Sequence, residues 1–254
     1  MPAYSLVIGI LGLTAALGMR GLQPAPTAPA SMESAGGSAK GSVAILPTGS
    51  LHGDEVPHDA AGDWFALVSE VTGVTLRPVS VSLVPEQDMM DRDDEETGRR
   101  VEVSPPLDPI VLVRGLPSFT GHVTTALIGQ SIDVGPGVET RLNNVSSRLW
   151  LRCSEGPAVQ GERQQRCALT LQSDSRRQTL FTYTAWIRRA EGIWPAERPP
   201  LVLWAGDLDL DGTLDILLDT SEHWNVTDTR LFLSSAARGD QLVSDVAGFR
   251  STGC

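Results

Sequence analysis

The stretch from residue 74 to residue 84 alternates apolar and polar side chains. Its apolar positions are separated by threonine, arginine and serine. Because successive side chains of a β-strand point to opposite faces, this period of two predicts a strand with one buried face. No stretch of the chain keeps a helical period over three turns. The chain is therefore constrained to build its core mainly from β-sheets.

Further short apolar segments predict strands along most of the chain. They are punctuated by 25 glycines and 17 prolines, as the many turns of a sandwich or barrel require. We expect an all-β fold with sandwich-like domains, and the absence of an internal repeat argues against a propeller of several blades. These further strands are expected at residues 43–46, 64–68, 100–103, 110–113, 148–152, 167–171, 179–184, 201–204, 214–218, 230–233 and 241–246.

The 254 residues are enough for one large domain or two smaller ones. We predict an N-terminal β domain over residues 42–130 and a C-terminal β domain over residues 138–254. In front of them, residues 3–19 form an apolar run that is short for a membrane span. A small-residue cleavage site follows at Ala28-Pro29-Ala30.

The N-terminal pattern predicts a signal peptide over residues 1–30 and a Pro/Ala/Ser/Gly-rich linker over residues 31–41. We therefore expect a protein that is secreted or held in the periplasm or cell envelope, with no membrane span after the signal is removed. An uncleaved anchor and a buried N-terminal element remain alternatives.

The charge balance excludes one class of partner. Formal net charge is -11, from 20 basic and 31 acidic side chains, and Lys40 is the only lysine. Nucleic-acid binding needs clustered lysine and arginine along the phosphate backbone, so we expect no nucleic-acid partner. We expect the scattered arginines to serve surface ion pairs.

The three cysteines fit an oxidising compartment. Cys153 and Cys167 flank the polar segment 154–166, which lies between two predicted strands. We predict that they form a disulfide that closes a hairpin, which is worth about 3 kcal/mol in the chain-entropy model. Two unpaired, partly buried thiols are the alternative. Cys254 is left over, either free or paired with another molecule.

Aspartates occupy every second position at the start of the segment 207–215 and recur at its end. Gly212 stands where the loop must turn sharply, and Thr213 offers a backbone carbonyl. Calcium takes six to eight oxygen ligands at about 2.3–2.6 Å in flexible geometry, whereas zinc prefers histidine and cysteine. An acidic turn without an ion is the alternative. We predict a structural calcium ion held by Asp207, Asp209, Asp211, Thr213 and Asp215.

The predicted calcium loop departs from an EF-hand. Leu218 stands at the twelfth position, where an EF-hand has a bidentate glutamate, and the flanking segments are strand-like instead of helical. With Asp215 at the ninth position and strands on both sides, residues 204–218 resemble the calcium loops of FG-GAP and VCBS repeats. The resemblance implies that the residues named above bind calcium. The rest of the chain resembles secreted bacterial proteins.

A second motif points to different chemistry. The segment 51–56 reads Leu-His-Gly-Asp-Glu-Val after a predicted strand. It resembles the His-x-x-Glu zinc motif of zinc carboxypeptidases and aspartoacylase-like deacylases, which implies zinc binding by His52 and Glu55. A third ligand would come from His122 or His223. An ordinary polar turn is the alternative.

Two further segments allow more than one interpretation. Residues 86–96 hold seven acids against one arginine, and we expect a solvated loop there, with a weak second calcium site as the alternative. Residues 238–240 read Arg-Gly-Asp, the tripeptide that integrins recognise, but they also suit a hairpin turn.

The sequence therefore predicts a secreted, non-enzymatic calcium-binding β-protein that acts as a binding or envelope module for a protein or glycan ligand. A secreted zinc-dependent hydrolase using His52 and Glu55 is one alternative. A cell-surface adhesion module is the other.

Overall fold

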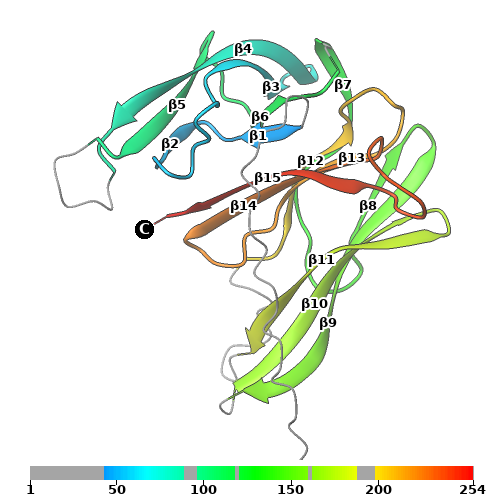
Figure 1. The fold of residues 1–254 in the computed structure, drawn as a ribbon. Helices are drawn as coiled ribbons and strands as arrows, with labels where there is room; N and C mark the ends of the chain where they lie inside the picture. Colours follow the sequence, from blue (N-terminus) through cyan, green and yellow to red (C-terminus); the bar gives the residue numbers. More distant parts are fainter. Residues whose placement is uncertain (1–42, 89–95, 118–119, 160–161, 188–197, 254) are drawn as a thin grey trace, which may run out of the picture. The chain divides into compact units, whose positions relative to one another are not determined.

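The computed structural model describes residues 43–88, 96–117, 120–159, 162–187 and 198–253. The predicted signal peptide and linker, and Cys254, lie outside the described residues. The expected all-β fold is confirmed, because the described residues form strands and no helix (Figure 1). The strands are β1 (Ala44–Leu46), β2 (Gly49–His52), β3 (Gly62–Glu70), β4 (Gly73–Glu86), β5 (Gly98–Ser104), β6 (Val111–Arg114), β7 (Gly121–Ser131), β8 (Val138–Leu142), β9 (Val145–Val159), β10 (Glu162–Ser173), β11 (Arg176–Ile187), β12 (Leu201–Asp207), β13 (Asp215–Asp219), β14 (Val226–Leu233) and β15 (Ser244–Thr252).

The named strands pair into two antiparallel sheets. An 11-stranded sheet has the main order β1-β6-β3-β4-β7-β12-β13-β14-β15, with β5 beside β4 and β2 beside β5. A four-stranded sheet has the order β11-β10-β9-β8. Within the large sheet, β7 pairs with β4 on one side and β12 on the other. The predicted N-terminal and C-terminal β domains thus share one sheet, because β7 of the first pairs with β12 of the second.

The large sheet curls so that its two end strands, β1 and β15, lie close together. One core fills the space inside it. Buried side chains of β3, β4 and β6 at one end meet those of β12 to β15 at the other, as Trp64, Leu112, Leu217 and Phe249 illustrate. The sheet therefore approaches a closed barrel, which leaves few strand edges exposed.

Strands β12, β13 and β14 are buried on both faces. In β13, Leu217 joins the core inside the curled sheet, whereas its neighbours Ile216 and Leu218 join a second core. Leu149 and Leu169 of the four-stranded sheet line the other side of that second core. A strand with apolar contacts on both faces needs a continuous apolar run, which explains the Ile-Leu-Leu sequence of β13.

Strands β9 and β10 form a long hairpin that carries the predicted disulfide. Cys153 and Cys167 face each other directly in the β9–β10 register and are bonded, so the prediction is confirmed. The strands run further than expected, because β9 continues to Val159 and β10 begins at Glu162. The segment 154–166 has no apolar alternation, yet its backbone pairs across most of its length.

Candidate metal centre

The aspartate-rich segment forms the connection between β12 and β13. Asp207 ends β12 and Asp215 begins β13. Gly206 lets β12 approach β7 closely, because a Cβ on it would lie 2.1 Å from the carbonyl oxygen of Thr124. Leu208 and Leu214 insert into the inner core and the second core, respectively. The loop between them is therefore anchored at both ends.

Three carboxylates converge inside this loop. One oxygen each from Asp207, Asp209 and Asp215 lies within 4.8 Å of the other two. Asp215 is fully buried and Asp207 is only 6% exposed. Two unit charges at that separation repel by about 3 kcal/mol at an effective dielectric constant of about 20. Three such pairs oppose folding by an amount comparable with the whole stability of a domain, roughly 5–15 kcal/mol. The cluster therefore favours either protonation or a bound cation.

Two oxygens of the cluster have no hydrogen-bond partner. Oδ1 of Asp207 and Oδ1 of Asp209 are both buried, and neither accepts a hydrogen bond of normal geometry from a described residue. A buried polar atom without a partner loses its hydration and gains nothing in return, which makes such atoms rare in native structures. Both atoms belong to residues of the converging group, so a cation there would satisfy them together.

Two other carboxylate oxygens of the cluster are held by hydrogen bonds from the loop backbone. The amide of Gly212 donates to Oδ2 of Asp207 at 3.0 Å, and the amide of Leu208 donates to Oδ2 of Asp215 at 2.8 Å. These bonds fix the orientation of both carboxylates. One oxygen of Asp207 is consequently tied to the loop while the other remains available.

Serines that follow β14 complete the surroundings of the cluster. The amide and hydroxyl of Ser234 donate to Oδ1 of Asp215 at 2.8 and 2.9 Å. The hydroxyl of Ser235 donates to Oδ2 of Asp209. The spacing of the aspartates gives no indication of either serine. Their contribution depends on the pairing of β13 with β14, which places Phe232 opposite Ile216 and brings the end of β14 to the start of β13.

Burial changes the acidity of two members of the cluster. Desolvation raises the pKa of Asp215 to about 7, and the nearby charge of Asp209 adds to this effect. Desolvation also raises the pKa of Asp207, with further contributions from the charges of Asp211 and Asp209, although the amide of Gly212 opposes the shift. Without a cation, the cluster thus holds protons more tightly than ordinary aspartates do.

Asp211 and Thr213 lie differently from the other predicted ligands. Asp211 is exposed and is not part of the converging group. One of its oxygens accepts the amide of Thr213 at 2.7 Å, and the other accepts the hydroxyl of Ser234 at 2.9 Å. Asp211 therefore stabilises the loop through hydrogen bonds on its exposed side.

The loop backbone adopts two left-handed conformations. Gly212 has a φ of 83°, which agrees with its predicted position at the sharp turn. Leu210 has a φ of 64° although it carries a side chain, and such residues are concentrated at functional sites. The amide nitrogen of the Asn143 side chain donates to the carbonyl oxygen of Gly212 at 3.0 Å and holds the turn from the β8–β9 connection.

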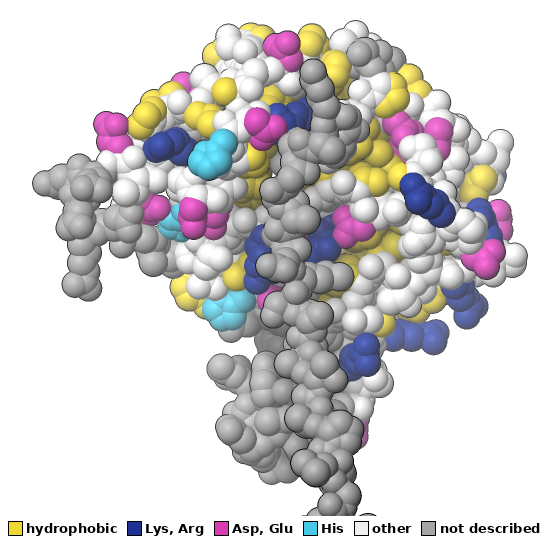
Figure 2. Space-filling view, viewed as in Figure 1, with side chains coloured by type: hydrophobic (Ala, Val, Ile, Leu, Met, Phe, Trp, Pro, Cys, Tyr) yellow, Lys and Arg dark blue, Asp and Glu magenta, His cyan; other side chains and the backbone are white. Residues whose placement is uncertain are grey.

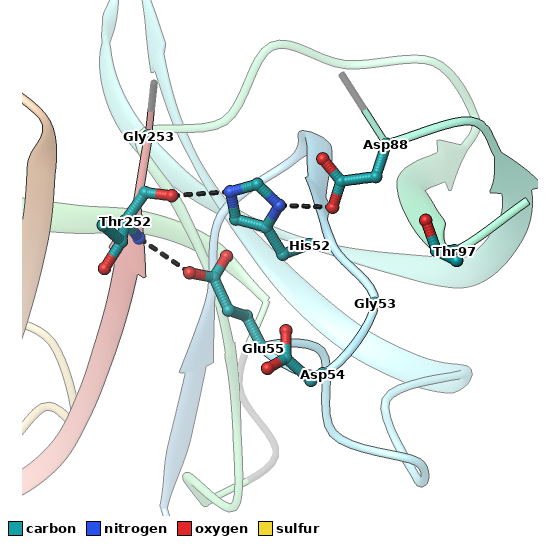
Figure 3. Close-up of a pocket in the computed structure, with 8 residues that line it drawn as sticks. All are labelled: His52, Gly53, Asp54, Glu55, Asp88, Thr97, Thr252 and Gly253. Carbon is teal, nitrogen blue, oxygen red and sulfur yellow. Dashed lines mark hydrogen bonds and ion pairs between the residues drawn. The ribbon is translucent and has the colours of Figure 1, made fainter. Parts of the chain in front are cut away.

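The His52 motif lines a separate pocket (Figure 3). His52 ends β2 and points between Asp88 and the last residues of β15. Its Nδ1 contacts Oδ2 of Asp88, and its Nε2 lies 2.6 Å from the carbonyl oxygen of Thr252. Glu55 accepts the amide of Thr252 through Oε1 at 2.6 Å. The two motif residues thus connect β2 and its turn to the C-terminal strand.

The contacts of His52 favour its charged form. Both of its partners are acceptors, so both ring nitrogens donate, and the hydrogen bond to Asp88 is the main cause that raises its pKa. A histidine binds zinc through a lone pair on a ring nitrogen, which this arrangement leaves unavailable. Among the residues that the structure describes, neither His122 nor His223 joins His52 in a group with metal-ligand spacing.

The Arg-Gly-Asp tripeptide lies in the connection between β14 and β15. Arg238, Gly239 and Asp240 are exposed, and the amide of Gln241 donates to the carbonyl oxygen of Arg238 at 3.2 Å, which closes a turn. Within the acidic stretch 86–96, residues 89–95 lie outside the described part of the chain.

Comparisons of the chain with protein-family models, with curated proteins and with solved structures gave no match. The described residues contain no helix long and apolar enough to cross a membrane. The disulfide between Cys153 and Cys167 is consistent with an oxidising location.

Proposed function

We propose that this is a calcium-binding β-protein in which a single ion, held by Asp207, Asp209 and Asp215, stabilises the connection between β12 and β13. The observation that carries the proposal is the pair of buried, unpartnered oxygens on Asp207 and Asp209 within the converging group. An ion at that position relieves the repulsion between the three carboxylates and replaces the missing hydrogen bonds. Its role is structural, because it joins residues that belong to adjacent strands.

Calcium suits the site better than other common ions. All three side chains offer oxygen, which disfavours zinc, and the loop is irregular and strained, which suits the flexible coordination of calcium. Magnesium needs near-ideal octahedral geometry and keeps several of its own waters. Water and backbone carbonyls of the loop supply the remaining ligands.

Isothermal titration of the metal-free protein with CaCl₂ tests the proposal. We expect one calcium per chain, and we expect Asp207→Asn to abolish binding because the variant loses one of the converging charges. Asp240→Asn removes the same charge from an exposed turn and serves as the matched control. Binding that survives in Asp207→Asn, or the absence of binding in the wild type, would refute the proposal.

We also propose that the protein works outside the cytoplasm as a non-enzymatic binding or envelope module. The disulfide supports this proposal, as does the apolar N-terminal run in the sequence. The zinc-hydrolase alternative is less favoured, because both ring nitrogens of His52 are used in hydrogen bonds.

A further inference from the structure

The indole ring of Trp150 is surrounded by arginines. The guanidinium carbons of Arg148, Arg152 and Arg177 lie 5.8, 5.9 and 5.8 Å from its ring centroid. Two of these arginines flank Trp150 in β9, and the third comes from β11. Trp150 is left only 7% exposed, so its ring serves as a platform that holds the three cations.

These side chains lie on the outer face of the four-stranded sheet. Leu149 and Leu151, which alternate with them in β9, belong to the second core. Since successive side chains of a strand point to opposite faces, Arg148 and Arg152 face away from that core. Arg166 is exposed and lies on the same face, because its neighbour Cys167 is buried in the core. We call Arg148, Arg152, Arg166 and Arg177 the arginine face.

No ion pair neutralises the arginine face within the described residues, although Glu139 of β8 lies opposite Arg148 in the β8–β9 register. Arg148 donates to the carbonyl oxygen of Pro136 at 2.6 Å, and Arg177 donates to Oε1 of Gln172 at 3.2 Å, and both acceptors are neutral. No described carboxylate forms an ion pair with any arginine of the face. Other arginines of this acidic chain do form such pairs, namely Arg77, Arg100, Arg114, Arg198, Arg230 and Arg250.

The expectation that the arginines serve surface ion pairs therefore fails on this face. Basic side chains gather along the lower right of Figure 2, where β9, β10 and β11 lie in Figure 1. The three guanidinium groups around Trp150 lie within about 12 Å of one another, and the Debye length is about 8 Å at physiological ionic strength. They repel one another at low salt, and a bound anion relieves that repulsion.

We propose that the arginine face binds a linear acidic polysaccharide through its carboxylate or sulfate groups. The planar guanidinium group matches such groups in a two-point hydrogen bond, and a sheet face offers several in a row. A single thin chain can follow this face without approaching the rest of the molecule, whose net charge of -11 repels a broad anionic surface.

Other polyanions fit the face less well. Single-stranded nucleic acid is bound with bases stacked on exposed aromatic rings, but the ring of Trp150 is covered by its arginines. A DNA duplex or an anionic membrane presents a broad negative surface to the acidic remainder of the chain. An acidic polysaccharide requires neither an exposed ring nor a wide contact.

Calorimetric titration of the full chain at about 50 mM NaCl tests the proposal, because contacts of this kind weaken steeply with salt. The probes are heparin, which carries sulfate and carboxylate, and hyaluronate, which carries carboxylate alone. Dextran, poly(dT) and phosphatidylglycerol vesicles are the comparison ligands. We expect heparin or hyaluronate to bind, and we expect weaker or no binding of the three comparison ligands.

The variant Arg152→Gln/Arg177→Gln removes two exposed charges of the face, and we expect it to weaken polysaccharide binding at least about ten-fold. Arg77→Gln/Arg250→Gln makes the same charge change at ion-paired positions and should bind like the wild type. Arg166→Gln weakens binding without touching the Trp150 cluster, so it keeps the test valid if the double variant misfolds. The proposal is overturned if neither polysaccharide binds, if both double variants bind equally, or if poly(dT) or vesicles bind more tightly than the polysaccharides.

Discussion

Ser234 contacts Asp215 twice: its amide nitrogen and its hydroxyl oxygen lie 2.8 and 2.9 Å from Oδ1 of that carboxylate. Ser234 follows the last residue of β14, and Asp215 is the first residue of β13. The same hydroxyl reaches Oδ2 of Asp211 at 2.9 Å. The β14–β15 connection therefore holds the aspartate loop through Ser234. We expect the stability of the loop to depend on these contacts.

Replacing Ser234 by alanine tests this link. Ser234→Ala removes the hydroxyl that shares its single proton between Asp211 and Asp215, and a lost hydrogen bond to a buried charged group costs about 1–3 kcal/mol. We expect the free energy of unfolding in urea to fall by that amount. Ser50→Ala changes an exposed serine of β2 and should have little effect. Equal stability of the two variants would contradict the link.

Because β13 is buried on both faces, we expect a substitution at Leu217 to lower the free energy of unfolding strongly. This side chain is fully buried, and Leu217→Ala leaves a cavity in the inner core. Such changes cost about 2–5 kcal/mol of unfolding free energy. Val145→Ala, at a position 43% exposed, should cost less than about 0.5 kcal/mol. A loss below about 1 kcal/mol for Leu217→Ala would argue against a strand packed on both sides.

The disulfide should stabilise the β9–β10 hairpin through its constraint on the unfolded chain. Cys153 and Cys167 are 14 residues apart, a loop whose closure is worth about 3 kcal/mol in the chain-entropy model. We expect Cys153→Ala/Cys167→Ala to lower the unfolding free energy by about that amount. Dithiothreitol should destabilise the wild type similarly and leave the double variant unchanged. A wild type insensitive to the reductant would count against the bond.

His52 predicts a dependence of stability on pH. The Asp88 hydrogen bond raises the pKa of His52 above its ordinary value of 6.5, with help from the carbonyl of Thr252 and the charge of Glu55. A raised histidine pKa contributes stability that is complete below the unfolded pKa and is lost as pH rises through the folded pKa. His52→Gln should therefore destabilise more at pH about 5.5 than at pH about 8.5.

Thermal unfolding in saturating calcium at both pH values checks the His52 prediction, since calcium keeps the aspartate cluster ionised. His58→Gln, which removes an exposed histidine, is the control. A difference between wild type and His52→Gln that is the same at both pH values would show that the histidine is not linked to stability in this way.

Much of the fold follows from local patterns in the sequence. The alternation at residues 74–84 corresponds to β4, and the apolar run at residues 214–218 overlaps β13. Strands β2, β7 and β8 were missed, because β7 contains glycines and several polar residues and the other two are short and half polar. Their conformation depends on pairing with distant strands, which local periodicity does not report.

The candidate site was predicted in part. The spacing of Asp207, Asp209 and Asp215 identified three side chains that the structure brings together. Ser234 and Ser235 could not be predicted, because they approach the cluster only through the β13–β14 register. The arginine face was missed for a similar reason, since Arg148 and Arg177 become neighbours only across three paired strands.

The most direct test of a structural calcium ion is thermal unfolding with calcium and with a chelator. An ion at 100 times its dissociation constant stabilises the folded state by about 2.7 kcal/mol. The melting temperature of the wild type should therefore rise by several degrees in calcium relative to EGTA. For Asp209→Ala the two conditions should give the same value. A wild-type melting temperature that is unchanged by the chelator would contradict a structural calcium ion at this loop.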